Sequence, residues 1–357
     1  MSLKTSLLGL AAGAAGIAVA GTAVQVARRR RIIARRGVGD AVAFGSLRST
    51  PSTVVTDDGV PLYVEIDEVD GARGRRSADG RLTVVFVHGY ALNLDCWHFQ
   101  RAGYRGLVRT VFYDQRSHGR SGRSSDRNAT IDQLGTDLRH IIEHTAPDGP
   151  VVLVGHSMGG MSIIALAEQH PELFGSKIVG TALISTTAGG LSPHKALLPI
   201  LPAPLSGQLA SRLIAGLARG SRVIEGARRV GRGVALVATD RYAFGEDVPE
   251  SYVAFVDQML SGTPFDVIAE FFPSFGALDK FSVLAAFERV PTLIVCGTAD
   301  KITPVSLSRK LEAHVPTSTL VECEGAGHMV MMERHEQVNA ALDQLLAAAA
   351  THTPDVR

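Results

Sequence analysis

The chain has 357 residues, of which 45% are hydrophobic and 20% are charged, so it could form one large globular domain with an insertion, or two domains. A net charge of +1 argues against a protein that binds nucleic acid over its whole surface. The three cysteines, at positions 96, 296 and 323, are too few and too scattered for a disulfide framework or a zinc cluster. We therefore expect buried thiols, which fit a reducing compartment.

The N-terminal segment Ser6–Ala27 has 22 residues without a charge, enough to cross a bilayer as a helix. Six arginines follow within Arg28–Arg36. By the positive-inside rule, this order predicts a membrane anchor with the rest of the chain on the cytoplasmic side. Two alternatives remain. Ala18–Ala23 offers small-residue cleavage sites of a secretory signal peptide, although the arginines downstream oppose export. The segment could also be a weakly hydrophobic helix that packs on something else.

The next segments are typical of surface structure and a hairpin. Gly37–Pro51, composed mainly of glycine, alanine, serine and arginine, is typical of a linker or surface segment. Thr53–Thr56 and Pro61–Asp67 flank the turn signal Asp57-Asp58-Gly59, which predicts a β-hairpin. The polar, glycine-containing run Asp70–Arg81 predicts an exposed loop.

From there the chain alternates short apolar runs with longer runs of helical periodicity. The apolar runs predict strands at Leu82–Val87, Thr110–Tyr113, Val151–Val154, Ile178–Ile184, Thr292–Val295 and Thr319–Val321. The other runs predict helices at Ile131–Thr145, Met161–Gln169, Val305–Ala313 and Glu336–Ala350. This alternation predicts an α/β fold, with a mostly parallel twisted sheet flanked by helices and ligands bound at the carboxyl ends of the strands.

One region breaks the alternation. Residues 187–287 contain several helical patterns and no clear strand, and they follow a central strand at the ligand-binding edge, so we expect a helical cap there. Its arginines form either an ordinary solvated face or a basic surface for anionic lipid headgroups. The predicted organisation is an anchor with its basic flank at 1–36, core at 37–186, cap at 187–287 and core again at 288–357.

The central motif is Gly155-His156-Ser157-Met158-Gly159, between a predicted strand and a predicted helix. A serine in such a tight turn needs small neighbours, because side chains two residues away on either side would collide with the adjacent strand and helix. The turn exposes the Ser157 hydroxyl and places the N–H of Met158 at a helix N-terminus, where it can face an oxyanion. Ser157 is therefore the candidate nucleophile.

A serine nucleophile needs a base, and the base needs an acid that orients it. In elbows of this kind the acid and then the base follow the serine along the chain. Asp300 and His328 each lie just past a predicted strand, so both should project at the same edge as Ser157. Asp279 is the nearest competitor of Asp300. The other downstream histidines fit less well as the base, since they lie at a helix end, in the cap, or in or beside helices: His170, His194, His314 and His335.

The second oxyanion donor should come from the loop after another strand, and we choose the N–H of Tyr90, in His88-Gly89-Tyr90. Asp114–Ser121 also follows a strand, and we assign it structural hydrogen bonds at a glycine turn. A metal site of Asp114, His118 and His88 is a minor alternative. Trp97 and Met329 are candidate pocket residues, although Trp97 fits packing against the helix after Tyr90 equally well.

Together these motifs resemble the α/β-hydrolase superfamily, in its serine-nucleophile branch with a helical cap between core strands 6 and 7. The resemblance covers roughly Thr53 to Ala350. It implies Ser157 as nucleophile, His328 as base, Asp300 as acid, the backbone amides of Tyr90 and Met158 as oxyanion hole, and no cofactor. Epoxide hydrolases and haloalkane dehalogenases of this superfamily carry aspartate at the elbow, and serine there argues against both. The N-terminal anchor departs from the usual soluble pattern.

The leading functional hypothesis is a membrane-anchored serine hydrolase of carboxylic esters, with lipidic substrates favoured by the anchor and the basic, apolar cap. The same three residues would also serve a thioesterase, an amidase, an acyltransferase, a carbon–carbon bond hydrolase or a cofactor-free perhydrolase. A catalytically silent scaffold on this fold is the non-enzymatic alternative. The expected partners are an ester substrate and a membrane, without nucleic acid.

Overall fold

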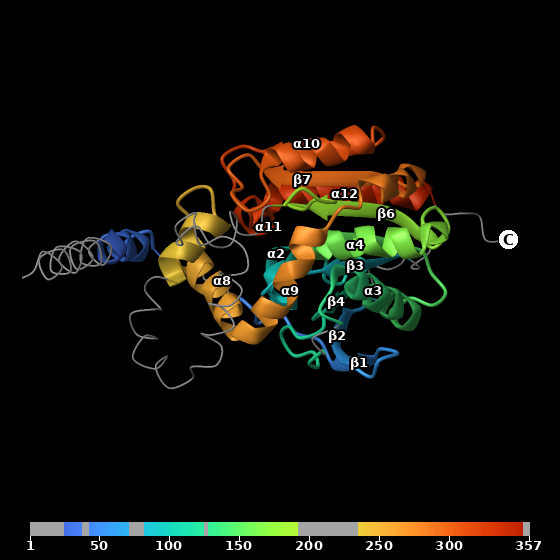
Figure 1. The fold of residues 1–357 in the computed structure, drawn as a ribbon, viewed down its shortest axis with the longest axis horizontal. Coiled ribbons are helices and arrows are strands. Elements are labelled where there is room, and N and C mark those ends of the chain that lie inside the picture. The colour runs from blue at the N-terminus through green and yellow to red at the C-terminus, as the bar shows by residue number, and fades with distance from the viewer. Residues whose placement is uncertain (1–24, 38–42, 71–81, 125–127, 192–234, 353–357) are drawn as a thin grey trace, which may run out of the picture.

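The computed structural model describes residues 25–37, 43–70, 82–124, 128–191 and 235–352 (Figure 1). At its centre lies an eight-stranded sheet in the order β1-β2-β4-β3-β5-β6-β7-β8. Its strands are β1 Pro51–Val55, β2 Pro61–Asp67, β3 Thr83–Val87, β4 Arg109–Tyr113, β5 Val151–His156, β6 Ile178–Ile184, β7 Thr292–Gly297 and β8 Thr319–Cys323. β2 pairs antiparallel with β1 and β4, and the pairs from β4 to β8 are parallel. The predicted hairpin and the mostly parallel sheet are thus confirmed.

Helices cover both faces of this sheet (Figure 1). The α-helices are α2 His98–Tyr104, α3 Ile131–Thr145, α4 Met158–Gln169, α8 Glu250–Gly262, α9 Phe265–Ala277, α10 Val305–His314, α11 Val330–Glu333 and α12 His335–Thr351. Shorter 3-10 segments are η1 Leu94–Trp97, η3 Pro171–Leu173 and η5 Phe281–Arg289. Residues 25–34 and 235–243 are also helical. Helix α3 begins after Thr130, whose hydroxyl accepts the N–H of Gln133 and so caps the first turn.

The two faces of the sheet belong to two separate hydrophobic clusters. Along β3, Val84 and Phe86 lie in one cluster and Val85 and Val87 in the other, because successive side chains of a strand point to opposite faces. Residues of α2, α11 and α12 complete the first cluster, and residues of α3, α4 and α10 complete the second. Every residue of β3, β5, β6 and β7 is buried, as expected for parallel strands covered on both sides.

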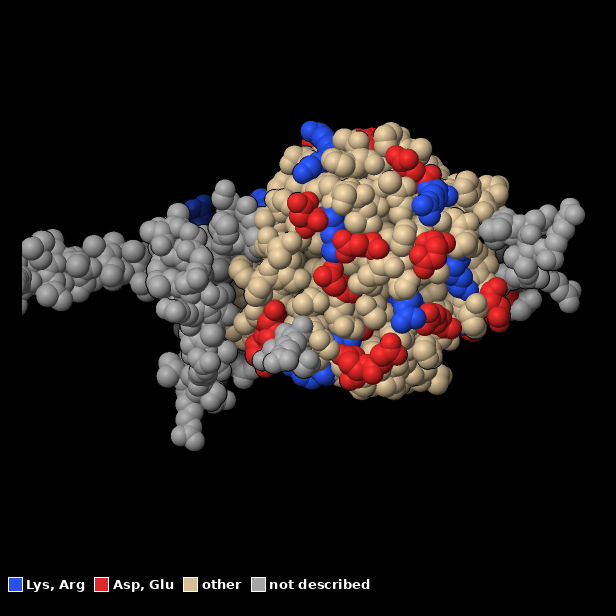
Figure 2. Space-filling model, turned by 45° about the vertical axis from the view of Figure 1, so that its right-hand side comes forward, with Lys and Arg blue, Asp and Glu red and all other residues tan. Residues whose placement is uncertain are grey.

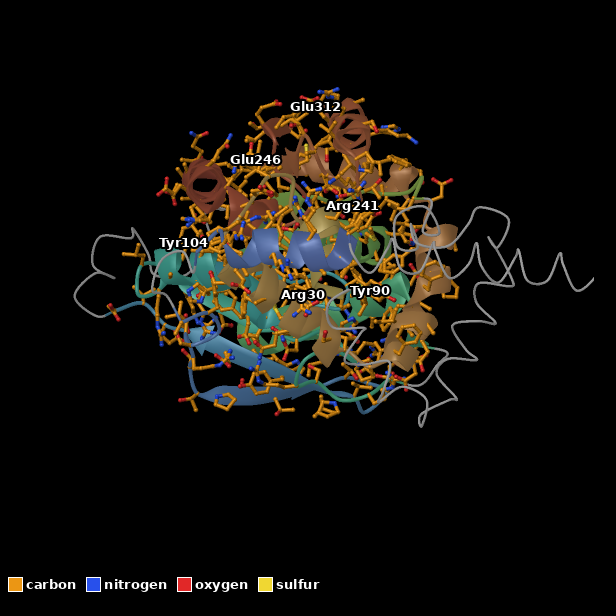
Figure 3. The ribbon with its side chains drawn as sticks, turned by 90° about the vertical axis from the view of Figure 1, so that its left-hand side faces the viewer. Arg30, Tyr90, Tyr104, Arg241, Glu246 and Glu312 are labelled. Carbon is orange, nitrogen blue, oxygen red and sulfur yellow. The ribbon has the colours of Figure 1, made fainter. Side chains whose placement is uncertain are left out.

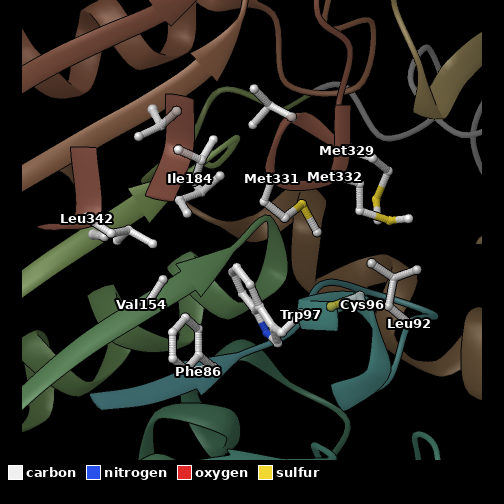
Figure 4. Packing of buried hydrophobic residues seen from close by; sticks show 14 of the residues in the cluster. Phe86, Leu92, Cys96, Trp97, Val154, Ile184, Met329, Met331, Met332 and Leu342 are labelled. Carbon is white, nitrogen blue, oxygen red and sulfur yellow. The ribbon is translucent and has the colours of Figure 1, made fainter. Parts of the chain in front are cut away.

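The first cluster is shown in Figure 4. Trp97 stands between the strands and α11, with its ring centroid 5.2 Å from that of Phe86. Met331 and Leu342 bring α11 and α12 onto the same cluster. This layer adjoins the sheet edge at which β5, β7 and β8 end, and Ser157, Asp300 and His328 follow those three strands.

Between β6 and β7, the described residues form the helix of residues 235–243, α8, α9 and η5. α8 and α9 lie beside the sheet edge rather than over the sheet faces (Figure 1). The arginines of the predicted cap form either a solvated face or a lipid-binding surface, and of these only Arg241 belongs to the described part of the chain. The others lie outside it: Arg212, Arg219, Arg222, Arg228, Arg229 and Arg232.

The predicted membrane span Ser6–Ala27 lies outside the described residues except for its last three positions. Within the described ranges, none of the helices combines the length and the apolar character needed to cross a bilayer. The described helix of residues 25–34 crosses the side of the molecule that also carries Arg241 and Glu246 (Figure 3).

This N-terminal helix is docked on the protein. Ile33 is fully buried in the first hydrophobic cluster. Arg36 donates to Asp240 at 2.5 Å and to Asp247 at 2.6 Å, and Arg29 reaches the same two carboxylates at 2.9 and 3.1 Å. The Asp240 side chain is 1% exposed, so these arginines neutralise a buried charge. At least two of the six arginines in the basic flank are thus bound within the protein.

Basic and acidic side chains are interspersed over the described surface of the face shown in Figure 2, and neither sign forms an extended field there. Surface pairs of the described residues, such as Arg309 with Glu322 at 2.6 Å, contribute to this mixture of signs. The mixture agrees with the net charge of +1 for the whole chain.

Candidate active site

Ser157 lies between the end of β5 and the start of α4, at a backbone conformation of φ 52° and ψ −117°. This is a strained conformation for a residue with a side chain, and it is held by hydrogen bonds on both sides of the residue. The Ser157 N–H donates to the carbonyl of Ile184 at 2.9 Å, and the Ser157 carbonyl accepts the hydroxyl of Thr186 at 2.7 Å. Neighbouring β6 and the loop after it therefore fix the turn.

The two glycines of the motif are required by close backbone contacts. A Cβ on Gly155 would lie 2.6 Å from the backbone of Gly159, and a Cβ on Gly159 would lie 2.1 Å from the carbonyl oxygen of Val87. These are the collisions with the helix and the neighbouring strand that the spacing predicts. Helix α4 starts at Met158, three residues earlier than predicted, so the Met158 N–H belongs to the first turn, where N–H groups have no partner within the helix.

Backbone strain gathers at this edge of the sheet. Among the described residues, the non-glycine residues with positive φ are Ala91, Ser117, Ser157 and Ser185. Each of them follows within a few residues the end of one of the four adjacent strands β3 to β6. Strained backbone collects at functional sites, where surrounding contacts hold it in place. The strain therefore points to the same edge as the sequence motifs.

His328 and Asp300 meet at this edge. His328 Nδ1 lies 2.8 Å from Asp300 Oδ2, and both residues are buried, with 6% and 5% exposure. Because a carboxylate only accepts, Nδ1 carries the proton, which leaves Nε2 free to act as a base. Asp279, the competing acid, is exposed in the segment after α9.

Asp300 is held as a carboxylate. Its Oδ1 accepts the N–H groups of Ile302 at 2.8 Å and Thr303 at 2.9 Å, and its Oδ2 accepts the Thr303 hydroxyl at 2.8 Å. Burial favours the neutral acid, but the His328 ring and these hydrogen bonds outweigh burial and hold the pKa of Asp300 below its ordinary value. Asp300 is therefore ionised at neutral pH. Thr303 also lies 3.2 Å from His328 Nδ1, a contact that the sequence analysis missed.

His156 is a second residue that the sequence analysis passed over, although it lies within the serine motif. Its ring centroid is 4.8 Å from that of His328, and its Nε2 donates to the His328 carbonyl at 3.0 Å. Burial, together with the neighbouring His328, lowers the pKa of His156 to about 3. His156 is therefore neutral and holds the backbone of His328 from the side of β5.

The chain at Gly89 and Tyr90 passes directly beside the elbow. A Cβ on Gly89 would lie 2.7 Å from His156 Nδ1 and 3.2 Å from the Ser157 Cβ. The side chain of Tyr90 is held by α9, since its hydroxyl donates to the Ile268 carbonyl and its ring meets Phe275 edge-on at 4.9 Å. Backbone atoms of the predicted oxyanion loop thus lie next to Ser157.

His88 and Asp114 are engaged in structural hydrogen bonds. His88 Nδ1 donates to the Gly89 carbonyl at 2.8 Å, and its Nε2 accepts the Gln115 N–H at 2.9 Å. The Asp114 carboxylate accepts the N–H groups of Leu94 at 2.7 Å and Arg120 at 2.8 Å. Burial lowers the pKa of His88 to about 3 and raises that of Asp114 to about 6. These contacts agree with the structural role assigned to the Asp114–Ser121 loop, and they engage both ring nitrogens of His88 and both carboxylate oxygens of Asp114.

The two candidate pocket residues lie in the hydrophobic core. Trp97 is fully buried against Phe86 and, edge-on at 6.4 Å, against His156, while Met329 is 2% exposed. Trp97 therefore packs behind the elbow in this structure, and a role of Trp97 or Met329 in an acyl pocket stays a prediction.

Helix α9 covers the elbow from the other side. Val267, Phe271 and Phe275 of α9 form one hydrophobic cluster with Met158 and Met161 of α4. An apolar surface thus adjoins the residue directly after Ser157. This apolar wall excludes water from the α4 side of the elbow.

Comparisons with known proteins identify the family of this chain. The model of the alpha/beta hydrolase family matches residues 84–341. The monoacylglycerol lipase of Mycolicibacterium smegmatis is 26% identical over 283 residues, which cover 77% of this chain and 90% of the lipase. Epoxide hydrolase 1 of Caenorhabditis elegans is 31% identical over 112 residues, which cover 31% of this chain and only 28% of that protein.

Among solved structures, a thermophilic esterase from Thermogutta terrifontis is similar, with a TM-score of 0.62 and 22% identity over 85% of this chain and 100% of the esterase. At this identity the likeness shows the fold alone. The family model spans well over half of the sequence, from β3 into α12, and takes in the serine elbow, the Asp300 loop and the His328 loop. The chain therefore belongs to the alpha/beta hydrolase family, with serine at the elbow.

Proposed function

We propose that this protein is a serine hydrolase that cleaves carboxylic esters with Ser157 as nucleophile, His328 as base and Asp300 as the orienting acid. The observation that carries the proposal is the 2.8 Å hydrogen bond between His328 and Asp300 at the sheet edge where Ser157 occupies the strained elbow. It is also supported by the esterase and lipase activities in the names of the similar proteins.

In the proposed reaction, Ser157 Oγ attacks the ester carbonyl carbon while His328 Nε2 takes the hydroxyl proton. The N–H groups of Tyr90 and Met158 stabilise the negative oxygen of the tetrahedral intermediate. As the intermediate collapses, His328 returns the proton to the departing alcohol, and the acyl group remains on Ser157. A water molecule, deprotonated by His328, then releases the carboxylic acid and restores the serine. Asp300 remains ionised and stabilises the His328 imidazolium both when the acyl-enzyme forms and when water cleaves it.

We propose a lipidic acyl group as the substrate class, such as that of monoacylglycerols, lysophospholipids or fatty acyl esters. The support is the apolar wall of α9 beside Met158, together with the monoacylglycerol lipase among the relatives. An apolar environment beside the nucleophile favours an alkyl chain over a polar acyl group.

The test is fluorophosphonate labelling of the wild type and Ser157→Ala, combined with a series of p-nitrophenyl esters of increasing acyl length. We expect the wild type to label and turn over the esters, with preference for longer acyl chains, and the variant to lose both activities. A wild type that neither labels nor hydrolyses any ester would support the silent-scaffold alternative instead.

We also propose that Ser6–Ala27 anchors the protein in a membrane, with the hydrolase on the cytoplasmic side. The support is its 22 uncharged residues followed by the six arginines within Arg28–Arg36. In fractionated cells the wild type should stay in the membrane pellet after alkaline carbonate extraction, whereas Ile17→Lys should appear in the supernatant. A wild type recovered in the supernatant contradicts the anchor, and a mature mass lacking the first residues identifies a signal peptide.

A further inference from the structure

Glu333, the last residue of α11, binds two chain segments that are distant in sequence. Its Oε2 accepts the N–H of Gly327, the residue before His328, at 2.7 Å. Its Oε1 accepts the N–H of Glu246 at 2.8 Å, and both oxygens lie 3.2 Å from the N–H of Gly245. One carboxylate therefore collects three peptide N–H groups, from the His328 loop and from the segment that leads into α8.

The two segments touch through their backbones. A Cβ on Gly245 would lie 2.0 Å from the carbonyl oxygen of Gly325, and a Cβ on Gly327 would lie 2.4 Å from the nitrogen of Gly245. On the other side of His328, the Met329 N–H donates to the Ala243 carbonyl at 2.8 Å. The His328 loop is thus packed directly against residues 243–246, without side chains in between.

Hydrogen bonds from peptide N–H groups to an ionised carboxylate are about twice as strong as neutral ones. Removing the carboxylate would leave three N–H groups at this contact without their acceptor. Asp300 and His156 hold His328 from the directions of β7 and β5, by the ring and the carbonyl. Glu333 holds the His328 loop from a third side, against the segment that precedes α8.

We propose that Glu333 is a positioning residue: it fixes the His328 loop against residues 243–246 and thereby sets the place of the His328 imidazole relative to Ser157. It touches no reacting atom. Since it acts through His328, the inference rests on the proposed serine-hydrolase function. It adds that the position of the His328 base depends on how residues 243–246, which precede α8, pack against the His328 loop.

The test compares Glu333→Gln and Glu333→Ala with Glu336→Gln, an exposed glutamate of the next helix, as the matched control. The maximal turnover rate of each protein is divided by the amount of Ser157 that the fluorophosphonate titrates. This gives kcat per reactive site and excludes unfolded protein. We expect Glu333→Ala to lose about 10–100-fold in kcat per titrated site, with kcat/KM falling equally, because a misplaced base weakens only the transition state. Glu333→Gln, which keeps one acceptor oxygen, should fall in between, and Glu336→Gln should equal the wild type.

A purely structural role would lower the yield of titratable enzyme and leave kcat per site unchanged, which would overturn the proposal. If Glu333→Ala does not fold, the nearly isosteric Glu333→Gln decides. Gly245→Ala disturbs the same contact without changing Glu333, and we expect the same equal loss of kcat and kcat/KM. A wild type that neither labels nor turns over ester refutes the proposed function itself. A reactive wild type with Glu333 and Gly245 variants of normal kcat refutes only the positioning role.

Discussion

The reactivity proposed for Ser157 depends on residues that have no functional groups. Gly155 and Gly159 let the strand, the turn and the helix approach one another closely, and Ser157 between them takes a strained conformation. The strain is maintained by the hydrogen bonds to Ile184 and Thr186. The position of the Ser157 side chain therefore depends on backbone contacts that leave no room for a Cβ at Gly155 or Gly159.

Gly159→Ala should accordingly disable the elbow. Its Cβ would lie 2.1 Å from the Val87 carbonyl oxygen, so β3 and α4 must separate. We expect a loss of stability of about 1–3 kcal/mol and loss of fluorophosphonate labelling. The control is Gly262→Ala at the end of α8, where a Cβ meets no atom within 4 Å. Urea unfolding and labelling measure both effects, and a fully labelled, stable Gly159→Ala would contradict this account.

The variants Asp300→Asn and Asp279→Asn should show which of the two aspartates is the orienting acid. In Asp300→Asn, the amide cannot hold the imidazole with its proton on Nδ1 as a carboxylate does, and it removes the charge that stabilises the imidazolium. We expect kcat to fall by about 10³–10⁴-fold. Asp279→Asn should leave kcat unchanged, since Asp279 is exposed after α9. The reverse result, with Asp279→Asn as the damaging change, would show that the acid has been assigned to the wrong residue.

At the scale of elements, the N-terminal helix and the segment before α8 form one charged contact. Arg29 and Arg36 share the carboxylates of Asp240 and Asp247, of which Asp240 is buried. The basic flank, whose arginines orient the predicted anchor by the positive-inside rule, thus also has an internal role. The same segment includes Gly245 and Glu246, which Glu333 binds, so the N-terminal helix and the His328 loop both contact residues 240–247.

Arg36→Gln should release the N-terminal helix without unfolding the sheet. Loss of one partner leaves the buried Asp240 undercompensated, at a local cost of about 3 kcal/mol. We expect faster amide hydrogen exchange in residues 25–34 and faster tryptic cleavage within Arg28–Arg31, with unchanged exchange in β5 and β6. Arg30→Gln, at an exposed position of the same helix, is the control. Equal exchange in both variants would mean that Ile33, rather than the ion pairs, retains the helix.

For the whole molecule, buried histidines link stability to pH. Burial is the main cause that lowers the pKa of His88 and His156 to about 3 and that of His118 to about 4, from 6.5. Unfolding therefore takes up protons below about pH 6.5, and the free energy of unfolding falls as the pH falls toward 4. Asp114, with its pKa raised from 3.8 to about 6, works in the opposite direction in the same window.

For these four groups together, the net uptake on unfolding is about two protons between pH 6 and pH 4, so their contribution to stability should fall by up to about 3 kcal/mol per pH unit there. Urea titrations at successive pH values from 7.5 to 5 measure the slope. His118→Asn should reduce it, since His118 is fully buried and its Nε2 has no hydrogen-bond partner among the described residues. A urea midpoint that stays constant over this range would contradict the assignment of neutral, buried histidines.

Hydrophobic periodicity and glycine spacing were enough to predict the sheet, its hairpin and the residues after each strand. A buried parallel strand needs a continuous apolar run, and a turn with no room for a side chain needs glycine. Both requirements are local in sequence. Predicted strand ends differ from those of the structure by one or two residues, as at Thr83 and Cys323. The candidate nucleophile, base and acid could therefore be named from the sequence, and their roles stay predictions until measured.

Contacts between distant segments could be found only in the tertiary structure. The sequence contains no sign that Glu333 binds Gly245 and Gly327, that His156 donates to His328, or that Arg36 reaches Asp240. Each of these is one polar residue whose partner depends on how separate elements pack, and no local pattern encodes that packing. The sequence by itself thus determined which chemistry lies at the sheet edge. Only the tertiary structure decided what holds that chemistry in place, because those partners meet solely through packing.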